Sequence, residues 1–185
     1  TVRAYLDSIS QDIEQRNYER IREDLRRVSS ASDKMRELLD GLLKLSRVGR
    51  IVNAPEEIPL NALAEAAAAI AAGRLAARRV ATVVAPNLPA VRVDRQRMVD
   101  VFVNLLDNAA KFMGEQAEPR VEIHAEAEGG RVTVRVCDNG VGIEAGQHER
   151  VFGLFERLSP ASEGTGLGLA VVHGIMRRHG GWAEF

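Results

Sequence analysis

Three short segments of the chain contain residue types that can bind phosphates, metal ions and flat aromatic bases. The first is Asn104–Phe112, in which Asn104, Asn108 and Lys111 recur at intervals of four and three residues. At 100° per residue, these three side chains share one face of a helix. A carboxamide oxygen can bind a hard cation such as Mg²⁺, and a lysine can approach phosphate oxygens. The same groups could equally form a solvated surface, so this segment alone does not decide the chemistry.

The second segment, Asp138–Ile143, follows an apolar strand pattern and contains Gly140 and Gly142. By composition it is a turn, because Asp and Asn before glycine are common turn signals. A carboxylate at the end of a strand can also accept a hydrogen bond from an exocyclic amine, and glycines let a flat base approach the backbone. Both interpretations fit this segment taken alone.

The third segment, Gly164–Leu169, has alternate glycines and leads directly into the pattern of the last helix. Glycines followed by the free amides of a helix N-terminus can form a site for phosphate. A flexible loop that closes onto a helix has the same composition. A Rossmann dinucleotide site is disfavoured, because no suitable parallel-strand unit with a later ribose-binding acid is evident.

Two helices are expected in the first fifty residues, which lack proline and have apolar residues at intervals of three and four. The break between them is expected near Gln15–Tyr18, and the second helix is expected to run to about Arg50. Such a hairpin cannot cover its own apolar stripe, which favours pairing with a second copy into a four-helix bundle. Folding of the hairpin back onto its own domain is the alternative.

A mixed α/β domain is expected after the prolines of Asn53–Pro59, which end the helical pattern and belong to a linker or a first short strand. The following patterns predict helices at about Asn61–Arg78, from the cap Asp94 to about Gly114 and Gly166–His179, and strands at Val80–Ala85, Val91–Val93, Val121–Ala127 and Val132–Val136. The last two strands form a hairpin across Glu128–Gly130, and the last helix stops at Gly180-Gly181. The predicted fold class is α+β: a helical hairpin over residues 1–52, half of a dimeric four-helix bundle, followed by a mixed α/β domain over residues 53–185.

Composition excludes several other classes of protein. Lysine and arginine number 25 against 26 acids, which lacks the basic excess of a nucleic-acid binder or membrane-surface protein. No apolar run approaches the roughly 20 residues that span a bilayer. The one cysteine, Cys137, excludes an internal disulfide, indicates a reducing cytoplasmic setting and is expected to pack within its strand. Neither a nucleic-acid partner nor a membrane contact is therefore expected.

The three segments together resemble a known family. Asn104–Phe112, Asp138–Ile143 and Gly164–Leu169 are similar to the asparagine box and the two glycine boxes of two-component sensor histidine kinases, in the order that family uses. Val151–Arg157 resembles its phenylalanine box, within the lid over ATP, and Val28–Arg50 resembles the second helix of its dimerisation hairpin. The resemblance covers nearly the whole chain. It implies that residues 53–185 form a two-layer α/β sandwich, the ATP-binding domain shared by histidine kinases and gyrase-like, Hsp90-like and MutL-like ATPases.

The resemblance implies ATP and Mg²⁺ as ligands. Asn108 would be the Mg²⁺ ligand, with Asn104 and Lys111 near the phosphates. Arg157 would balance charge at the γ-phosphate. Asp138 would read the adenine amino group.

Glycine-rich backbone would complete the site that the resemblance implies. Gly140 and Gly142 would shape the base pocket. Backbone amides of the third segment would line the triphosphate, and the residues assigned to this role are Gly164, Thr165, Gly166, Leu167 and Gly168.

Asn104 bears on the type of reaction. The wider ATPase superfamily has a glutamate at this position, four residues before the metal-binding asparagine, where it orients or deprotonates the attacking water. A carboxamide cannot act as a general base at neutral pH, which disfavours hydrolysis and favours transfer to a histidine. ATP hydrolysis and a catalytically silent dimeric scaffold remain the alternative functions.

None of the four histidines, His124, His148, His173 and His179, has the context of the family's phosphate acceptor, which is followed by an acidic residue and then a proline. The acceptor is therefore expected several residues before Thr1, and both ends of the chain are expected to be trimmed. On this interpretation the chain is the cytoplasmic core of a sensor histidine kinase, homodimeric through residues 1–52, and membrane anchoring of the parent protein stays open. It would pass phosphate by way of the missing histidine to a response regulator aspartate, and it would not phosphorylate itself alone.

Overall fold

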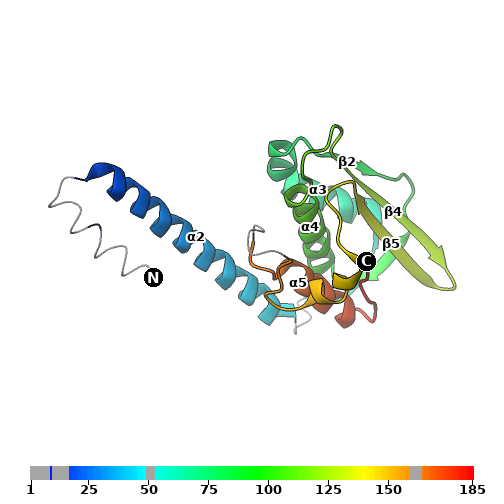
Figure 1. The fold of residues 1–185 in the computed structure, drawn as a ribbon. Helices are drawn as coiled ribbons and strands as arrows, with labels where there is room; N and C mark the ends of the chain where they lie inside the picture. Colours follow the sequence, from blue (N-terminus) through cyan, green and yellow to red (C-terminus); the bar gives the residue numbers. More distant parts are fainter. Residues whose placement is uncertain (1–8, 10–16, 49–52, 159–163) are drawn as a thin grey trace. The chain divides into compact units, whose positions relative to one another are not determined.

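The computed structural model describes residues 9, 17–48, 53–158 and 164–185. The chain divides into two compact units, Thr1–Leu43 and Lys44–Phe185, which are described separately (Figure 1). The first of the two expected helices, before the break at Gln15–Tyr18, lies outside the described residues except for Ile9.

Helix α2 (Tyr18–Val48) is one continuous helix of 31 residues (Figure 1). Asn17 precedes it, and its carboxamide oxygen accepts a hydrogen bond from the backbone N–H of Arg20 at 3.4 Å. The helix starts at the end of the expected break, because this polar residue satisfies one of the free amides of the first turn. Large apolar side chains of α2 are exposed, namely Tyr18, Leu25, Met35, Leu39, Leu42 and Leu43.

The second unit has two layers, which confirms the expected α+β fold. One layer contains helices α3 (Leu60–Ala77), α4 (Arg95–Lys111) and α5 (Gly168–Arg178), with α4 packed against both of the others. The other contains strands β1 (Glu56–Pro59), β2 (Ala81–Val84), β3 (Ala90–Val93), β4 (Arg120–Glu128) and β5 (Arg131–Asp138). Figure 1 shows the helices on one face of the sheet formed by β2, β4 and β5.

The strands form a three-stranded sheet in the order β2-β4-β5 and a two-stranded sheet of β1 and β3. β2 and β4 are parallel, whereas the pairs β4–β5 and β1–β3 are antiparallel. The hairpin of β4 and β5 closes at the pair Glu128 and Arg131, and the two glycines between them both have positive φ angles. This is the geometry of a two-residue turn that matches the twist of the flanking strands. The expected β-hairpin of these two strands is thereby confirmed.

The core of the second unit lies between its helices and its strands. α4 contributes Met98, Phe102 and Leu106, while β4 contributes Val121 and Ile123, all of them buried. α3 and α5 supply further buried members, including Leu60, Leu63, Ala64, Ala67, Ala71, Leu75, Val171, Val172 and Ile175. Burial of these faces holds α4 and α5 in place, which fixes the polar residues that they carry.

α3 is the one described helix with the length and hydropathy of a candidate membrane span. Its buried leucines and alanines belong to the core, so packing accounts for its apolar character. Asn61 in its first turn donates to the carbonyl of Ala85 and accepts from the N–H of Leu88, each at 2.9 Å. Asn61 therefore ties the turn between β2 and β3 to α3.

Several sequence expectations differ from the structure. The last helix begins at Gly168 rather than Gly166, because Gly164 and Gly166 have φ angles of 100° and 70° and cannot be helical. α4 ends at Lys111, and Phe112 is 39% exposed because it caps the end of the helix instead of continuing its apolar face. Cys137 is exposed rather than packed, because the valines of β5 occupy the face toward the helices.

Candidate functional site

The polar stripe of α4 consists of Asn104, Asn108 and Lys111. It approaches the glycine segment Gly164–Gly168, which leads into α5. A Cβ atom placed on Gly168 would lie 3.2 Å from Oδ1 of Asn104 and 3.6 Å from Oδ1 of Asn108. A Cβ placed on Gly164 would collide with Nζ of Lys111. The first and third sequence motifs, about sixty residues apart, therefore meet in space. The φ angle of 100° at Gly164 favours glycine there, and a side chain at Gly168 would press on the carboxamide of Asn104.

The orientation of Asn104 is fixed by its own helix. Its Nδ2 donates to the carbonyl oxygen of Asp100 at 2.7 Å. Oδ1 is the end nearest to Gly168. Asn104 therefore offers the glycine segment a hydrogen-bond acceptor, and its carboxamide has no basicity at neutral pH.

Lys111 and Asn108 have few partners of their own. Lys111 is half-buried, with Nζ 5.9 Å from the centre of the Phe112 ring, and no described carboxylate forms an ion pair with it. Within the described part of the chain, the carboxamide of Asn108 makes no hydrogen bond. A half-buried ammonium without a counter-ion attracts an anion, and a free carboxamide can bind a cation or a polar ligand.

The N-terminus of α5 faces the same place. Leu167 is its N-cap, with a side chain that is 2% exposed and cannot bond to the backbone amides. The first turn of α5 contains no acidic residue. Because the first amides of a helix lack partners within it, this end carries a partial positive charge and free donors. With Lys111, it forms a cradle suited to phosphate groups.

The second motif packs against the other end of the stripe. Oδ1 of Asp138 accepts from the N–H of Gly140 at 2.9 Å, and the N–H of Val141 donates to the carbonyl of Phe112 at 3.0 Å. A Cβ on Gly140 would lie 2.5 Å from that same carbonyl. The turn is therefore held tightly against the C-terminal end of α4, which places Asp138 at the end of β5 with its side chain exposed.

Asn139 holds the base of this turn. Its Nδ2 donates to the carbonyl of Glu118, and its Oδ1 accepts from the N–H of Arg120, both at 2.9 Å. The turn-like composition of Asp138–Ile143 did not indicate that the side chain of Asn139 bonds to the backbone of Glu118 and Arg120. Gly142 has a positive φ angle and open space around it.

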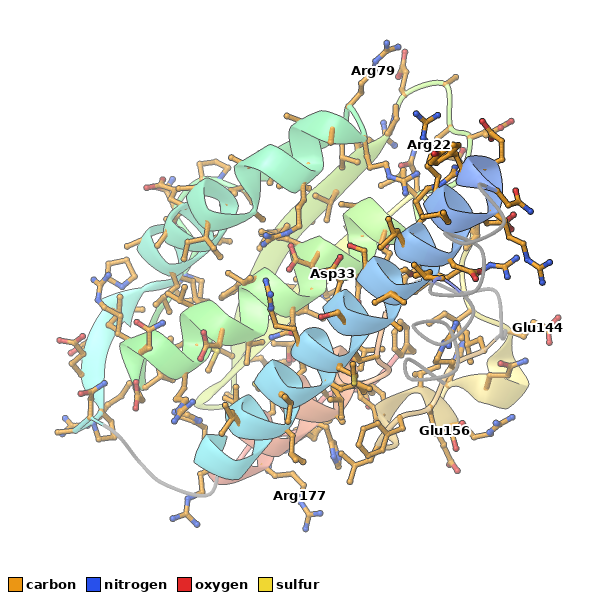
Figure 2. The ribbon with its side chains drawn as sticks, turned by 90° about the vertical axis from the view of Figure 1, so that its left-hand side faces the viewer. Arg22, Asp33, Arg79, Glu144, Glu156 and Arg177 are labelled. Atoms are coloured by element: carbon orange, nitrogen blue, oxygen red, sulfur yellow. The ribbon has the colours of Figure 1, made fainter. Side chains whose placement is uncertain are left out.

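A segment between β5 and α5 closes onto the glycine segment (Figure 2, where Glu144 and Glu156 mark it). The N–H of Phe155 donates to the carbonyl of Gly166 at 3.1 Å, and a Cβ on Gly166 would lie 2.5 Å from the carbonyl oxygen of Glu156. Phe155 has a φ angle of 61°, which is rare for a bulky residue. Arg150 and Glu156 form an exposed ion pair at 2.9 Å.

The remaining predicted residues lie close to this segment. Arg157 directly follows Glu156 and is half-buried, and Thr165 is half-buried between the two glycines. The structure brings together the stripe of α4, the glycine segment and the segment ending at Arg157. The individual roles of Asn104, Asn108, Lys111, Asp138 and Arg157 toward a ligand stay predictions.

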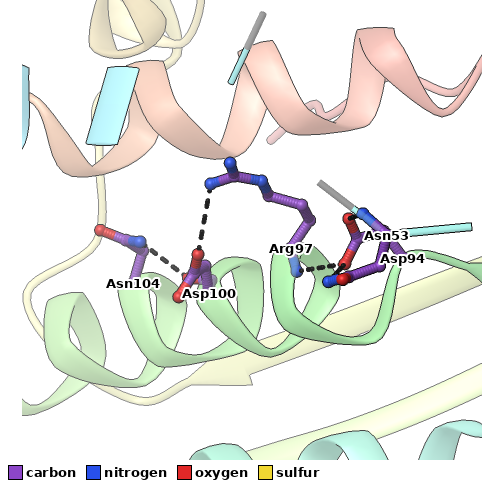
Figure 3. A network of polar contacts seen from close by, with 5 residues as sticks. All are labelled: Asn53, Asp94, Arg97, Asp100 and Asn104. Carbon is purple, nitrogen blue, oxygen red and sulfur yellow. Dashed lines mark hydrogen bonds and ion pairs between the residues drawn. The ribbon is translucent and has the colours of Figure 1, made fainter. Parts of the chain in front are cut away.

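A second polar cluster lies at the opposite end of α4 (Figure 3). Asp94, 2% exposed, accepts from the N–H of Arg97 at 3.3 Å, as expected for the N-cap, and from the N–H of Asn53 at 3.1 Å. Burial raises the pKa of Asp94, but these hydrogen bonds outweigh it and hold the pKa below its ordinary value of 3.8. The hydrogen bond between Asn53 and Asp94 could not be predicted from a local sequence pattern, because 41 residues separate the two partners.

The fold and these motifs agree with known proteins. The profile described as "Histidine kinase-, DNA gyrase B-, and HSP90-like ATPase" matches residues 93–185. The methanogenesis regulatory histidine kinase FilI of Methanothrix harundinacea (strain 6Ac) is 40% identical over 186 residues, which cover all of this chain and 21% of the relative. Cyanobacterial phytochrome B of Nostoc sp. is 33% identical over 159 residues, covering 83% of this chain and 21% of the relative.

Solved structures of histidine kinases share the fold. The crystal structure of full-length ShkA in complex with AMPPNP has a TM-score of 0.71 and 26% identity, covering 92% of this chain and 35% of that one. The chain belongs to the histidine kinase-, DNA gyrase B- and HSP90-like ATPase family, as the ATPase domain of a sensor histidine kinase. It spans about a fifth of the length of the two relatives.

Proposed function

We propose that this chain binds Mg-ATP and transfers the γ-phosphate to a histidine located before Thr1, for relay to an aspartate of a response regulator. The main support is the meeting of three unsatisfied groups at the glycine segment: the ammonium of Lys111, the carboxamide of Asn108 and the first turn of α5. A polyphosphate with its cation satisfies all three together. AMPPNP in the related ShkA crystal structure supports the same class of ligand.

Asn108 supplies an oxygen ligand for Mg²⁺. Among the described residues, no group of three or more His, Cys, Asp and Glu side chains could hold a metal alone. Asn108 would therefore hold Mg²⁺ together with the ATP phosphates, as is usual in phosphoryl-transfer sites. Mg²⁺, when bound, would supply charge neutralisation at the phosphates.

Lys111 and the amides of α5 hold the phosphates, and Arg157 balances charge at the γ-phosphate. Asn104 presents an acceptor that cannot deprotonate water, so hydrolysis receives no general base from it. Asp138 reads the adenine amino group with Oδ2, since Oδ1 already accepts from Gly140. Gly140 and Gly142 leave the base room beside the backbone.

Labelled ATP distinguishes the proposed function from its alternatives. The chain alone should bind ATP without forming phosphohistidine, and the chain extended by its native preceding segment should form an acid-labile, base-stable phosphoryl group. Both the protein-bound label and the released phosphate are measured. Steady phosphate release would instead identify an ATPase. An extended chain that binds ATP but gains no label would identify a silent scaffold.

A homodimer through residues 1–52 forms part of the proposal. The exposed Leu25, Leu39 and Leu42 of α2 give an apolar surface that pairing would remove from water. Sedimentation velocity at micromolar concentration should give a dimer, and deletion of residues 1–52 should give a monomer. A monomeric intact chain, or a dimeric deletion variant, would place the interface elsewhere. The setting is the cytoplasm, where the response regulator is the second partner.

A further inference from the structure

The turn that carries Asp138 is held from two sides, and Asn139 holds the first. The carboxamide of Asn139 donates to the carbonyl of Glu118 and accepts from the N–H of Arg120, both at 2.9 Å. Its backbone N–H adds a third bond, to the carbonyl of Arg120 at 3.3 Å. Both ends of a half-buried carboxamide are therefore used to tie the turn to the start of β4.

The end of α4 holds the second side of the turn. The N–H of Val141 donates to the carbonyl of Phe112 at 3.0 Å, and a Cβ on Gly140 would lie 3.1 Å from the Cα of Met113. Gly114 has a φ angle of 67°, and a Cβ placed on it would lie 2.9 Å from Cγ1 of Val141. These close approaches leave the turn little room to shift toward α4.

Phe112 links this turn to the polar stripe of α4. Its N–H donates to the carbonyl of Asn108 at 2.9 Å, while its own carbonyl accepts from Val141. Lys111 directly precedes it. A turn fixed on Phe112 therefore holds the carboxylate of Asp138 at a set spacing from the groups proposed to bind phosphate.

The direction of the Asp138 carboxylate depends on the backbone of the turn. Its side chain is exposed, and its hydrogen bond to the N–H of Gly140 lies within the turn itself. Oδ2, the oxygen proposed to read the adenine amino group, therefore moves with the turn. Because a hydrogen bond weakens steeply when its angle closes, a small rotation of the turn should cost recognition of the base.

We infer that Asn139 is a positioning residue that determines the selection of adenine over guanine. It holds the turn so that Oδ2 of Asp138 meets an exocyclic amine, and guanine presents an acceptor oxygen where adenine presents that amine. Asn139 acts through Asp138 and needs no contact with the ligand. This role rests on the proposed function, because it requires Asp138 to read the base.

Asn61 provides a matched control for a test of this role. Its carboxamide also makes two backbone hydrogen bonds of 2.9 Å, to Ala85 and Leu88, and it also ties a turn to a neighbouring element. Alanine therefore removes the same two kinds of bond at either position. A merely structural role of Asn139 predicts the same outcome for both variants, namely lower stability and unchanged base selection.

Asn139→Ala should lower ATP affinity about tenfold and GTP affinity far less, because a misdirected Oδ2 loses its hydrogen bond to the amine. Asn61→Ala should keep the wild-type ratio of the two affinities. Calorimetric titration with each nucleotide and Mg²⁺ measures the ratio, and its stoichiometry reports the folded fraction. ATP and GTP carry the same triphosphate, so the ratio cancels any effect on phosphate binding.

Two further variants sharpen the test. Asn139→Asp still accepts from the N–H of Arg120 but cannot donate to Glu118, so its ratio should fall by less than in the alanine variant, and it replaces that variant if alanine prevents folding. In an Asp138→Asn background, Asn139→Ala should change the ratio little further, because the group that it positions has already been replaced.

The outcomes distinguish this role from the proposed function. A wild type that prefers ATP, together with equal ratios in Asn139→Ala and Asn61→Ala, would refute the positioning role alone. A parallel loss of affinity for both nucleotides, or an undiminished effect of Asn139→Ala in the Asp138→Asn background, would do the same. A wild type that binds no ATP, or has no preference for it, would refute the proposed reading of adenine and the positioning role with it.

Discussion

Both ends of α4 carry polar side chains, but those at the N-terminal end have hydrogen-bond partners and, among the described residues, Asn108 and Lys111 toward the C-terminal end do not. At its N-terminal end, Asp94 is buried and both carboxylate oxygens accept hydrogen bonds from the chain. Toward its C-terminal end, Asn108 and Lys111 are half-buried and have neither a hydrogen-bond partner nor an ion-pair partner among the described residues. Unsatisfied polar groups cost stability, whereas satisfied ones contribute to it.

This difference separates positions that serve the fold from positions that await a ligand. A substitution at the satisfied end should lower stability and leave ligand affinity intact. A substitution at the unsatisfied end should lower ligand affinity or transfer and leave stability intact. The following predictions test this division, beginning with the largest effect.

Asn108→Ala should lower phosphoryl transfer by the extended chain on the order of 100-fold, because losing a metal ligand removes about 3 kcal/mol of charge stabilisation. Its urea midpoint should not fall, because the carboxamide has no partner to lose. Asn61→Ala is the matched control, since Asn61 uses both ends of its carboxamide in the fold. The control should lose stability and keep its transfer rate per folded molecule. The reverse pattern would contradict the assignment of Asn108.

Asp138→Asn should weaken ATP binding by roughly 1.5–3 kcal/mol, the value of a hydrogen bond to a charged group. The fold should persist, because the Asn oxygen can still accept from Gly140. Calorimetric titration with ATP and GTP measures the effect, which should be smaller for GTP. Equal ATP affinity in variant and wild type would remove Asp138 from the base pocket.

Asp94→Ala should lower the free energy of unfolding by about 1–3 kcal/mol, because it removes a helix cap and leaves the N–H of Asn53 without its acceptor. Asp94→Ser should lose less, since it keeps the cap. Urea denaturation followed by Trp182 fluorescence reports this unit. Nucleotide affinity should be unchanged in the folded variants, and a large loss of affinity would show that the two ends of α4 are not independent.

The smallest effect concerns pH. The pKa of Asp94 is lowered in the folded chain, so its stabilising contribution is complete above its ordinary value of 3.8 and is lost as the pH falls through the folded pKa. Asp94→Asn should therefore flatten the fall of stability in acid while leaving the slope between pH 5 and 8 unaltered. Urea midpoints measured across pH 3–7 would show this. A variant as acid-sensitive as the wild type would point to other carboxylates.

Local signals explain what the sequence could predict. Asp94 before an apolar run predicted the cap, Gly129-Gly130 predicted the hairpin, and Gly180 predicted the end of α5, where its φ angle is 73°. Each of these depends on residues within a few positions of one another. The three motifs of the site were each ambiguous alone, and they were recognised because their order and spacing resemble those of a known family.

Contacts between distant segments were not predictable in this way. The pairing of β1 with β3 joins two four-residue strands, and the link between Asn53 and Asp94 spans 41 residues. The start of the last helix was misplaced because glycine carries no helix signal. The left-handed backbone of Phe155 was missed because nothing in the residue type favours it, and it accompanies a close approach to Gly166, which lies farther along the chain.

That backbone conformation has an energetic consequence. A bulky residue in the left-handed region costs about 1–2 kcal/mol, which opposes the hydrogen bond between Phe155 and Gly166. Phe155→Gly would remove this cost, because glycine adopts positive φ angles without strain. The strain at Phe155 therefore makes the contact that covers the glycine segment weaker than its hydrogen-bond geometry alone indicates.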